Sequence, residues 1–464
     1  MTLITSISGI RGTINDSNDI CLSPDQIVKY SHLFGEWLKS NRNNNNMSIV
    51  IGRDARPTGH LISNIITSTL QMMGFVVIDL ELTTTPTVQL AIIHENCDGG
   101  IMISASHNPI EWNGLKLLNN LGEFLSPSQS QEVFNFIANQ FSLTDHLKAN
   151  SLVKMDYLNR HIQSILDLKD VNIEQIRKRK FKIVVDGINS SGGIYVPLLL
   201  KAIGVEVIEL NCVPNGLFAH NPEPIPLNLK TLSNRVIESK ADLGIAVDPD
   251  VDRLVLVCED GSFFGEEYTI VSVAKFILSK YTDSCVVSNL STTKALEDVA
   301  IECGAQHFSS AVGEINVVEL MKIKSAIIGG EGSGGVIFPE SHYGRDALVG
   351  IALFLTYVAD LNKSVKQLRM ILPNYYMIKE KIKISKNFKF NLFIENQINN
   401  CHKYNYQFNL IDGLKIIYKC GGWAHIRTSN TEPIIRVISE SKSEERSLEI
   451  QNDILNNIKN NQSK

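Results

Sequence analysis

Short apolar runs alternate with polar turns along most of the chain. Five of these runs are rich in β-forming residues and have the length of buried strands: residues 47–52, 100–104, 181–186, 244–247 and 325–329. The turns that follow them lead into segments with the length and pattern of helices. A repeated order of strand, turn and helix predicts an α/β fold.

We expect helices at residues 24–39, after the turn at 53–59, and at 126–141, 266–279 and 444–457. The first helix is preceded by Ser23, and the segment Ser-Pro-Asp-Gln predicts a capping box with proline at the first helical position. The turn at 53–59 carries Arg53 next to Asp54, which we interpret as structural, with a catalytic function as the alternative.

The composition changes after residue 372, where residues 379–384 alternate lysine and isoleucine and predict a strand. The order strand, helix, three strands, helix then predicts a small α+β domain. Residues 143–154 have little pattern and should connect two domains. We therefore predict three α/β domains followed by a C-terminal α+β domain, at residues 1–150, 151–254, 255–372 and 373–464.

Composition and charge exclude several classes of function. The 464 residues carry a net charge of −5 with no long basic run, which argues against a nucleic-acid or anionic-membrane surface. The eight cysteines include no Cys-x-x-Cys pair, so neither a zinc site nor a disulfide framework is indicated. No signal peptide is apparent, and apolar runs such as 349–358 are too short to cross a bilayer. We expect a cytoplasmic protein.

Residues 99–116 contain the first candidate site. A buried strand ends at Ser104, and the small and turn-forming residues that follow expose Ser106 beside a potential base, His107. From these residues alone, a polar turn is an equally good interpretation.

The segment 248–253 contains Asp248, Asp250 and Asp252, followed by Arg253. Three carboxylates at this spacing repel one another in a strand, but in a loop they converge as a hard divalent cation requires. The spacing does not fit an EF-hand. A solvated acidic turn is the alternative, which the flanking apolar strands disfavour.

Three further loops carry polar groups suited to ligands. Arg11 lies between glycines, which allow a close approach of the backbone to a phosphate. Residues 330–335 place Glu331 and Ser333 among four glycines, where a polyol could bind. A turn between two predicted strands could form an anion site from Arg427, Ser429, Asn430, Thr431 and the downstream Arg436. Plain surface turns are the alternative in each case.

Taken in order, Ser-Ala-Ser-His-Asn-Pro with Trp-Asn-Gly-Leu-Lys, Asp-x-Asp-x-Asp-Arg, Gly-Glu-x-Ser-Gly and Arg-x-Ser-x-Thr-Glu-Pro resemble the four loops of the α-D-phosphohexomutases (phosphoglucosamine mutase, phosphomannomutase and phosphoglucomutase). The resemblance spans nearly the whole chain. It implies three α/β/α domains and a C-terminal domain like the TATA-binding protein, arranged around a central cleft.

The resemblance also implies roles for the site residues. Ser106 would be a phosphoserine, and Lys116 would be a catalytic residue beside it that handles a proton or contacts the phosphate. Mg²⁺ would be held by the three aspartates and a phosphoserine oxygen. Arg253 would be a nearby cation, and Arg11 would lie in the active cleft. Glu331 and Ser333 would bind sugar hydroxyls, and the Arg427 loop would hold the phosphate that is not transferred.

The implied reaction moves phosphate between O6 and O1 of a hexose through a hexose 1,6-bisphosphate, which is also the expected activator. Phosphoglucosamine mutase is the first choice, with phosphomannomutase or phosphoglucomutase as the alternative. A sugar-phosphate phosphatase and a non-catalytic phosphosugar-binding protein are the other classes. The expected partner is a small phosphosugar, without nucleic acid or membrane, and the chain would be a monomer or homodimer.

One position departs from the family pattern. The sugar loop of the family ends in histidine, whereas this chain has Gly335. We expect either that His342 replaces it or that Lys116 and His107 suffice.

Overall fold

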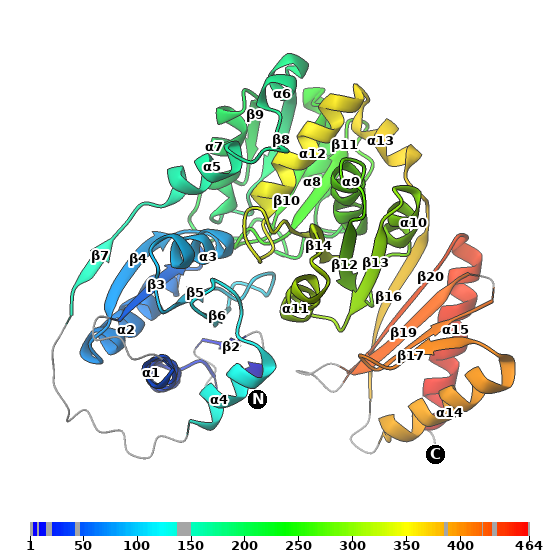
Figure 1. Ribbon diagram of the computed structural model, residues 1–464, viewed down its shortest axis with the longest axis horizontal. Coiled ribbons are helices and arrows are strands. Elements are labelled where there is room, and N and C mark those ends of the chain that lie inside the picture. Colours follow the sequence, from blue (N-terminus) through cyan, green and yellow to red (C-terminus); the bar gives the residue numbers. More distant parts are fainter. Residues whose placement is uncertain are drawn as a thin grey trace. The chain divides into compact units, whose positions relative to one another are not determined.

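The computed structural model describes residues 3–6, 9–14, 21–41, 47–136, 150–384, 388–419, 421–428 and 434–462. The chain forms two compact units (Figure 1). Unit 1 contains Met1–Ile277 and Ser333–Arg369, and unit 2 contains Leu278–Gly332 and Met370–Lys464. Each unit is described by itself.

The first part of unit 1 is a seven-stranded sheet in the order β1-β2-β6-β5-β3-β4-β7. Its strands are β1 (Ile4–Ser6), β2 (Gly9–Thr13), β3 (Ser48–Arg53), β4 (Val76–Leu82), β5 (Gly99–Ile103), β6 (Trp112–Leu118) and β7 (Leu152–Lys154). Strands β3, β4 and β5 are parallel, whereas β6 pairs antiparallel with both β5 and β2. The ends of β2, β5 and β6 therefore meet at the loop that contains Ser106.

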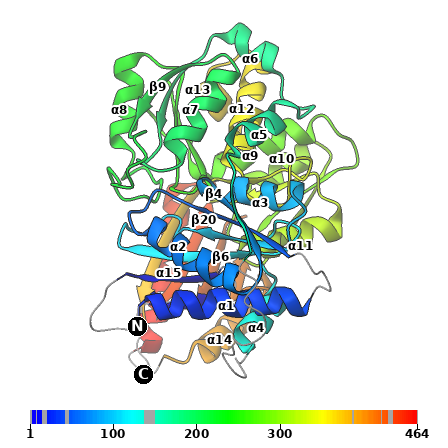
Figure 2. The same cartoon turned by 90° about the vertical axis from the view of Figure 1, so that its left-hand side faces the viewer.

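Four helices accompany this sheet: α1 (Pro24–Ser40), α2 (Gly59–Met72), α3 (Thr85–His94) and α4 (Pro127–Asn135). Figure 2 shows α1 and α2 side by side. Phe34 of α1, Ile66 of α2 and Val133 of α4 share one core with the sheet residues Ile49 and Ile101. Burial of this apolar surface is the main force that holds the layers together.

The second sheet of unit 1 has the order β11-β10-β8-β9, formed by β8 (Lys182–Asp186), β9 (Glu206–Leu210), β10 (Leu243–Val247) and β11 (Leu254–Cys258). Strand β11 is antiparallel to β10, so the short connection between them carries residues 248–253. Helices α7 (Gly192–Ala202) and α8 (Lys230–Ser239) pack on this sheet. Helices α5 (Leu158–Leu166), α6 (Ile173–Arg179) and α9 (Glu266–Leu278) also belong to this part of the chain. Strand β15 (Gly335–Ile337), α12 (Ala347–Leu361) and α13 (Val365–Ile371) follow later in the chain.

Unit 2 contains a parallel arrangement of β13 (Gln306–Ser310), β12 (Cys285–Asn289) and β14 (Ile328–Glu331), with helices α10 (Ala295–Glu302) and α11 (Glu314–Lys324). Its other sheet is antiparallel, in the order β16-β20-β19-β18-β17. These strands are β16 (Tyr376–Lys383), β17 (Gln407–Asn409), β18 (Leu414–Ile417), β19 (Trp423–Thr428) and β20 (Ile434–Ser441). Helices α14 (Phe390–Tyr404) and α15 (Glu444–Gln462) pack on it through one apolar core.

The predicted α/β class with a smaller C-terminal α+β domain is confirmed, and the four domain boundaries stay a prediction. Several details were wrong. The C-terminal domain has four strands between its helices instead of three. Ser23 forms no capping box, because its hydroxyl binds the Asp25 carboxylate instead of a helix amide. The strand expected at 325–329 begins at Ile328, since Ser325 is the left-handed end of α11.

The helix expected at 126–141 ends at Asn135, because Phe136 leaves the helical conformation with a ψ of 77°; residues 137–141 lie outside the described part. In the described part of the chain, no single helix is long and apolar enough to span a bilayer. The pair α12 and α13 reaches that length and composition only together, across a bend of 86°.

Asp346 anchors the start of α12. One carboxylate oxygen accepts hydrogen bonds from the Leu348 and Val349 amides, at 2.8 and 3.3 Å. The other accepts from the Nε2 atoms of His161 and His342, at 2.9 and 3.3 Å. Burial alone would raise the pKa of Asp346, but the two histidines lower it well below its ordinary value. The ionised carboxylate therefore ties α5 to α12.

We predict that Asp346→Ala destabilises unit 1 by about 3 kcal/mol, because it removes a helix cap and leaves buried polar groups unpaired. In calorimetry this should lower the melting temperature by roughly 6 °C. Asp167→Ala, at an exposed position, is the control and should change the melting temperature little. Equal melting temperatures for the two variants would contradict a structural role for Asp346.

Candidate active site

Ser106 lies in the turn after β5 in a left-handed conformation, with a φ of 49°. Its amide donates to Ser104 Oγ at 2.9 Å, and Ser104 Oγ donates to Asp54 at 2.6 Å. Arg56 donates to the carbonyl oxygens of Ser106 and Asn108, at 2.7 and 2.6 Å. A left-handed backbone is costly for a residue other than glycine, and these bonds hold it in place.

The ion pair behind this turn is Asp54 with Arg56, and both side chains are fully buried. The sequence predicts a structural function for Arg53 and Asp54, and this ion pair gives Asp54 a structural partner in Arg56. Arg53 donates to the Asp54 carbonyl oxygen, at 3.4 Å. A buried guanidinium with a paired carboxylate makes a rigid support for the Ser106 turn.

The Ser106 hydroxyl reaches the acidic loop. Its Oγ donates to Asp248 Oδ2 at 2.7 Å, across 142 residues of sequence. The His107 Nδ1 atom lies 3.3 Å from the same Oγ. The structure therefore brings together three of the residues that the sequence predicted for one site.

Asp248, Asp250 and Asp252, here called the acid triad, are all buried. Each offers a carboxylate oxygen, and these oxygens lie within 4.8 Å of one another. The loop bends sharply at Val251, whose φ of 64° is unusual for a β-branched residue. Asp248 Oδ1 stabilises the bend by accepting from the Asp252 and Arg253 amides, at 3.1 and 3.2 Å.

Positively charged side chains bind the Oδ2 atoms of Asp250 and Asp252. Lys116 Nζ donates to Asp250 Oδ2 and lies 3.2 Å from Asp252 Oδ2, and the Thr85 hydroxyl also donates to Asp250. Arg345 Nη2 donates to Asp252 Oδ2 at 2.7 Å. The Oδ1 atoms of Asp250 and Asp252 are buried and have no hydrogen-bond partner. Unpartnered buried carboxylate oxygens are costly, and a hard divalent cation fits them.

The surroundings of the acid triad shift the pKa values of Asp248 and Asp252 in opposite directions. Burial raises the pKa of Asp248 well above its ordinary value, and Asp252 and Asp250 raise it further. Burial also acts to raise the pKa of Asp252, but Arg345 and Lys116 outweigh it and the net shift is strongly downward. Asp252 is therefore firmly ionised, whereas Asp248 needs a neighbouring positive charge to stay ionised.

The pKa of Lys116 is raised, whereas the pKa of His107 is lowered. Burial acts to lower the pKa of Lys116, but two acids of the triad raise it above its ordinary value, so Lys116 stays an ammonium. Burial, followed by Arg253 and Arg11, lowers the pKa of His107 well below its ordinary value. His107 is therefore a neutral imidazole, with a ring nitrogen that can accept a hydrogen bond.

Two arginines lie beside the acid triad, and each has a buried donor group without a hydrogen-bond partner. Arg11, on β2, donates to Asn108 Oδ1 at 3.4 Å, and Arg253 Nε lies 3.8 Å from Asp252 Oδ1. The Nε atoms of both arginines are buried and have no hydrogen-bond partner. Such groups favour an anionic ligand.

Unit 2 gathers a second polar cluster. Glu331 Oε1 accepts from Asn289 Nδ2 at 2.7 Å and from the Gly313 amide at 3.1 Å. Arg427 and Arg436 are paired in register on β19 and β20, and the Nε atoms of both are buried without a hydrogen-bond partner. Burial lowers the pKa of Arg427, although Glu331 is one of the acids that act to raise it. The cluster thus combines a fixed carboxylate with two cations.

The remaining predicted ligand residues are placed only in part. Ser429, Asn430 and Thr431 lie outside the described residues. Glu331 belongs to unit 2, whereas Ser333 is the first residue of the second segment of unit 1.

His342 takes part in the Asp346 cluster, where its Nε2 donates at 3.3 Å. This contact gives His342 a structural function, and its replacement of the missing sugar-loop histidine stays an untested hypothesis. Gly335 has a different neighbour: a Cβ atom there would lie 2.3 Å from Arg345 Cδ.

Sequence reasoning missed three residues of this site: Arg56 behind the Ser106 turn, and Thr85 and Arg345 beside the acid triad. It named Asp54 but did not link it to Ser106. Thr85 lies 165 residues from Asp250, and Arg345 lies 93 residues from Asp252. No local spacing reveals such partners. Only the requirement that buried acids be neutralised indicates that further cations must exist.

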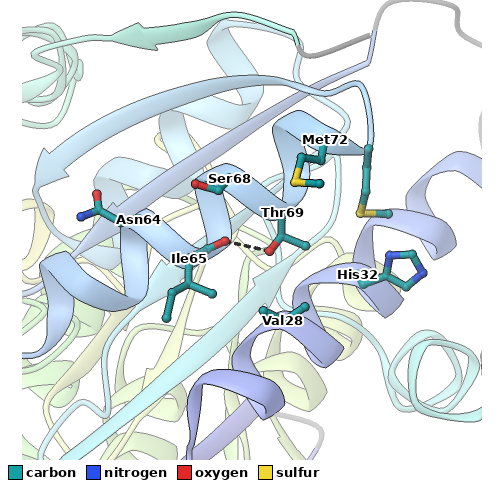
Figure 3. A pocket seen from close by; sticks show the side chains of 8 residues that line it. Val28, His32, Asn64, Ile65, Ser68, Thr69 and Met72 are labelled. Carbon is teal, nitrogen blue, oxygen red and sulfur yellow. Dashed lines mark hydrogen bonds between the residues drawn. The ribbon is translucent and has the colours of Figure 1, made fainter. Parts of the chain in front are cut away.

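A hollow of about 430 Å³ between α1 and α2 lies apart from these groups (Figure 3). Its walls include Val28, Ile65, Met72 and Met73, and are mainly apolar. The Thr69 hydroxyl there donates to the Ile65 carbonyl oxygen within α2, at 2.8 Å. The described residues that line the hollow include His32 but no carboxylate or lysine, so it lacks the cluster of charges that the acid triad provides.

Four family models match the chain in succession. They are phosphoglucomutase/phosphomannomutase alpha/beta/alpha domain I at residues 3–143, domain II at 159–261, domain III at 265–376 and the C-terminal domain at 378–457.

Whole-length relatives agree with these matches. The chain is 35% identical to a phosphoglucomutase/phosphomannomutase of Thermococcus kodakarensis, with 95% of each chain covered. It is 30% identical to a phosphoglucosamine/phosphogalactosamine mutase of Sulfurisphaera tokodaii, with 97% of each covered. The structure also resembles a phosphoglucomutase/phosphomannomutase family protein of Burkholderia thailandensis, with a TM-score of 0.84, 25% identity and 98% of each chain covered.

We predict that Asp250→Ala or Asp252→Ala abolishes binding of a divalent cation, because each removes one of the two buried oxygens that lack a partner. Titration calorimetry with Mn²⁺ measures this directly. Asp260→Ala removes an exposed carboxylate that pairs with Lys366, and this control should bind Mn²⁺ as before. Retained binding in both triad variants would rule out the acid triad as the cation site.

Proposed function

Because the chain belongs to the phosphoglucomutase/phosphomannomutase family of the α-D-phosphohexomutase superfamily, we propose that it transfers phosphate between O6 and O1 of a hexose phosphate through Ser106. The chain is a phosphohexomutase-type enzyme, and the proposal concerns its nucleophile, intermediate and substrate. The observation that carries the proposal is the 2.7 Å hydrogen bond from Ser106 Oγ to a buried acid triad, in which Oδ1 of Asp250 and Oδ1 of Asp252 accept no hydrogen bond.

In the first step, a sugar hydroxyl attacks the phosphorus atom of phospho-Ser106. An oxygen–phosphorus bond forms to the sugar as the bond to Ser106 Oγ breaks, which yields a hexose 1,6-bisphosphate. The proton that the sugar hydroxyl loses is balanced by the proton that the freed Ser106 Oγ takes up. In the return step, Ser106 Oγ attacks the phosphorus atom of the other phosphate, the bond from that phosphorus to its sugar oxygen breaks, and the sugar leaves as the product monophosphate with a proton on the freed oxygen. Neutral His107, 3.3 Å from Oγ, is placed to accept the serine proton in that step.

The acid triad would hold Mg²⁺ through Asp248 and the free oxygens of Asp250 and Asp252. When bound, the ion supplies positive charge that stabilises the transferring phosphoryl group and the leaving oxygen. Lys116, Arg11 and Arg253 add cations that do not depend on the metal. Together they form a preorganised positive environment for a phosphoryl group.

Unit 2 would recognise the rest of the substrate. Glu331 is fixed by Asn289 and Gly313 and can accept hydrogen bonds from sugar hydroxyls, a function we propose it shares with Ser333. Arg427 and Arg436 would bind the phosphate that is not transferred, with Ser429, Asn430 and Thr431 from the connecting loop. Between the two steps the bisphosphate would turn end for end. Each phosphate would then lie in turn beside Ser106 and beside Arg427 and Arg436.

Glucosamine phosphate is the first candidate substrate, and the Sulfurisphaera relative has a name that supports an aminosugar. Glucose or mannose phosphate is the second candidate, which the name of the 35% identical Thermococcus relative favours. A phosphatase would use the same phosphoserine but transfer its phosphoryl group to water, which releases free phosphate. A binding protein would not need a nucleophile beside the acid triad.

We predict that Ser106→Ala abolishes mutase turnover but retains binding of the hexose phosphate, because the arginines and Glu331 remain. Ser31→Ala is the matched control, since Ser31 is an equally buried hydroxyl that donates only to its own helix, at 2.6 Å to the Ile27 carbonyl oxygen. Full turnover by the Ser106 variant would eliminate the phosphoserine mechanism.

Substrate choice is tested by kcat/KM for the 1-phosphates of glucosamine, glucose and mannose, with free phosphate measured in the same reactions. We expect glucosamine 1-phosphate to give the highest value and free phosphate to stay negligible. A higher value for glucose or mannose would establish the second candidate. Stoichiometric phosphate release would indicate a phosphatase instead.

A further inference from the structure

Arg345 reaches the acid triad through a space that only glycine leaves open. Residue Ile337, at the end of β15, forms an antiparallel bridge with Arg345, and the Asp346 amide donates to the Val336 carbonyl oxygen at 2.9 Å. This pairing holds the Arg345 backbone beside β15. The side chain then folds over Gly335, where an added Cβ atom would lie 2.3 Å from Cδ and 3.1 Å from Cγ.

Beyond Gly335, the guanidinium ends at Asp252, with Nη2 2.7 Å from Oδ2. Lys116 Nζ lies 3.2 Å from the same oxygen. Both cations therefore bind Oδ2. The buried Oδ1 has no hydrogen-bond partner, and Arg253 Nε lies 3.8 Å from it. A guanidinium stays charged when it is buried, whereas a buried ammonium loses its proton more readily.

We propose that Gly335 and Arg345 act as one positioning device for the metal site. The missing side chain at 335 admits Arg345, and Arg345 holds Asp252 by Oδ2 so that Oδ1 is presented to the divalent cation. This inference rests on the proposed function only in taking the acid triad as the metal site. It also gives a physical reason for glycine where the family pattern has histidine, since a histidine there would occupy the path of Arg345.

If Gly335 and Arg345 act together, the effects of substituting them on ion binding should not add. Gly335 does not have a positive φ, so alanine can adopt its backbone conformation and Gly335→Ala changes only the space. The added methyl group must displace the flexible Arg345 side chain and so break its contact with Asp252. With Arg345 shortened to alanine, the same methyl group meets no arginine and should have no further effect.

The experiment measures Mg²⁺ and Mn²⁺ binding by titration calorimetry in the absence of sugar, for the unsubstituted chain, Arg345→Ala, Gly335→Ala and the double variant. Loss of a group that orients a metal ligand typically weakens affinity about 10- to 100-fold. We expect each single variant to bind at least about tenfold more weakly, and the double variant to bind like Arg345→Ala. Arg345→Lys should recover part of the affinity, because it restores the charge but not the fork of donors.

Arg179→Ala serves as the control, because Arg179 binds main-chain and side-chain oxygens near the far end of α12. It should bind both ions as the unsubstituted chain does. Unchanged affinity in Arg345→Ala, or additive losses in the double variant, would overturn the proposal, and so would absence of ion binding by the unsubstituted chain. Coupled ion binding in a chain without mutase turnover would instead refute only the proposed function.

Discussion

The concentration of negative charge in a buried loop is the constraint on which the rest of unit 1 depends. Three aspartates between two apolar strands would be expelled or protonated without compensation, because isolated buried charges are very costly. The fold supplies Lys116 from β6 and Arg345 from the segment before α12, and Ser106 donates its hydroxyl to Asp248. These three partners come from distant parts of the chain, so the acid triad forms only when unit 1 is complete.

Local strain is concentrated at the same place. Ser106 and Val251 both adopt left-handed backbone conformations. Ser106 is the proposed nucleophile, and Val251 lies between Asp250 and Asp252 of the acid triad. Buried bonds hold both conformations: Arg56 and Ser104 at the first turn, and Asp248 at the second. Because the turns are held before any ligand arrives, the reacting groups need little reorganisation, which is the condition for electrostatic stabilisation of a transition state.

Sequence reasoning succeeded where chemistry is local. Strand positions followed from short apolar runs, and the acid triad followed from carboxylates two residues apart. It failed where the outcome depends on a distant partner. It did not link Asp54 to Arg56, whose guanidinium also reaches the Ser106 turn. Thr85 and Arg345 carry no motif of their own, and their place beside the triad follows from the topology of the sheets. The extra strand of the C-terminal domain is short, only Gln407–Asn409, and gives little periodicity to detect.

The central claim is that one divalent cation binds between Ser106 and the acid triad. Diffraction from crystals soaked in Mn²⁺, recorded near the manganese absorption edge, tests it without assuming any activity. The account predicts one strong anomalous peak bounded by carboxylate oxygens of Asp248, Asp250 and Asp252, within coordinating distance of the Ser106 side chain. A crystal with no peak there, or with its manganese bound at another site, would contradict the account.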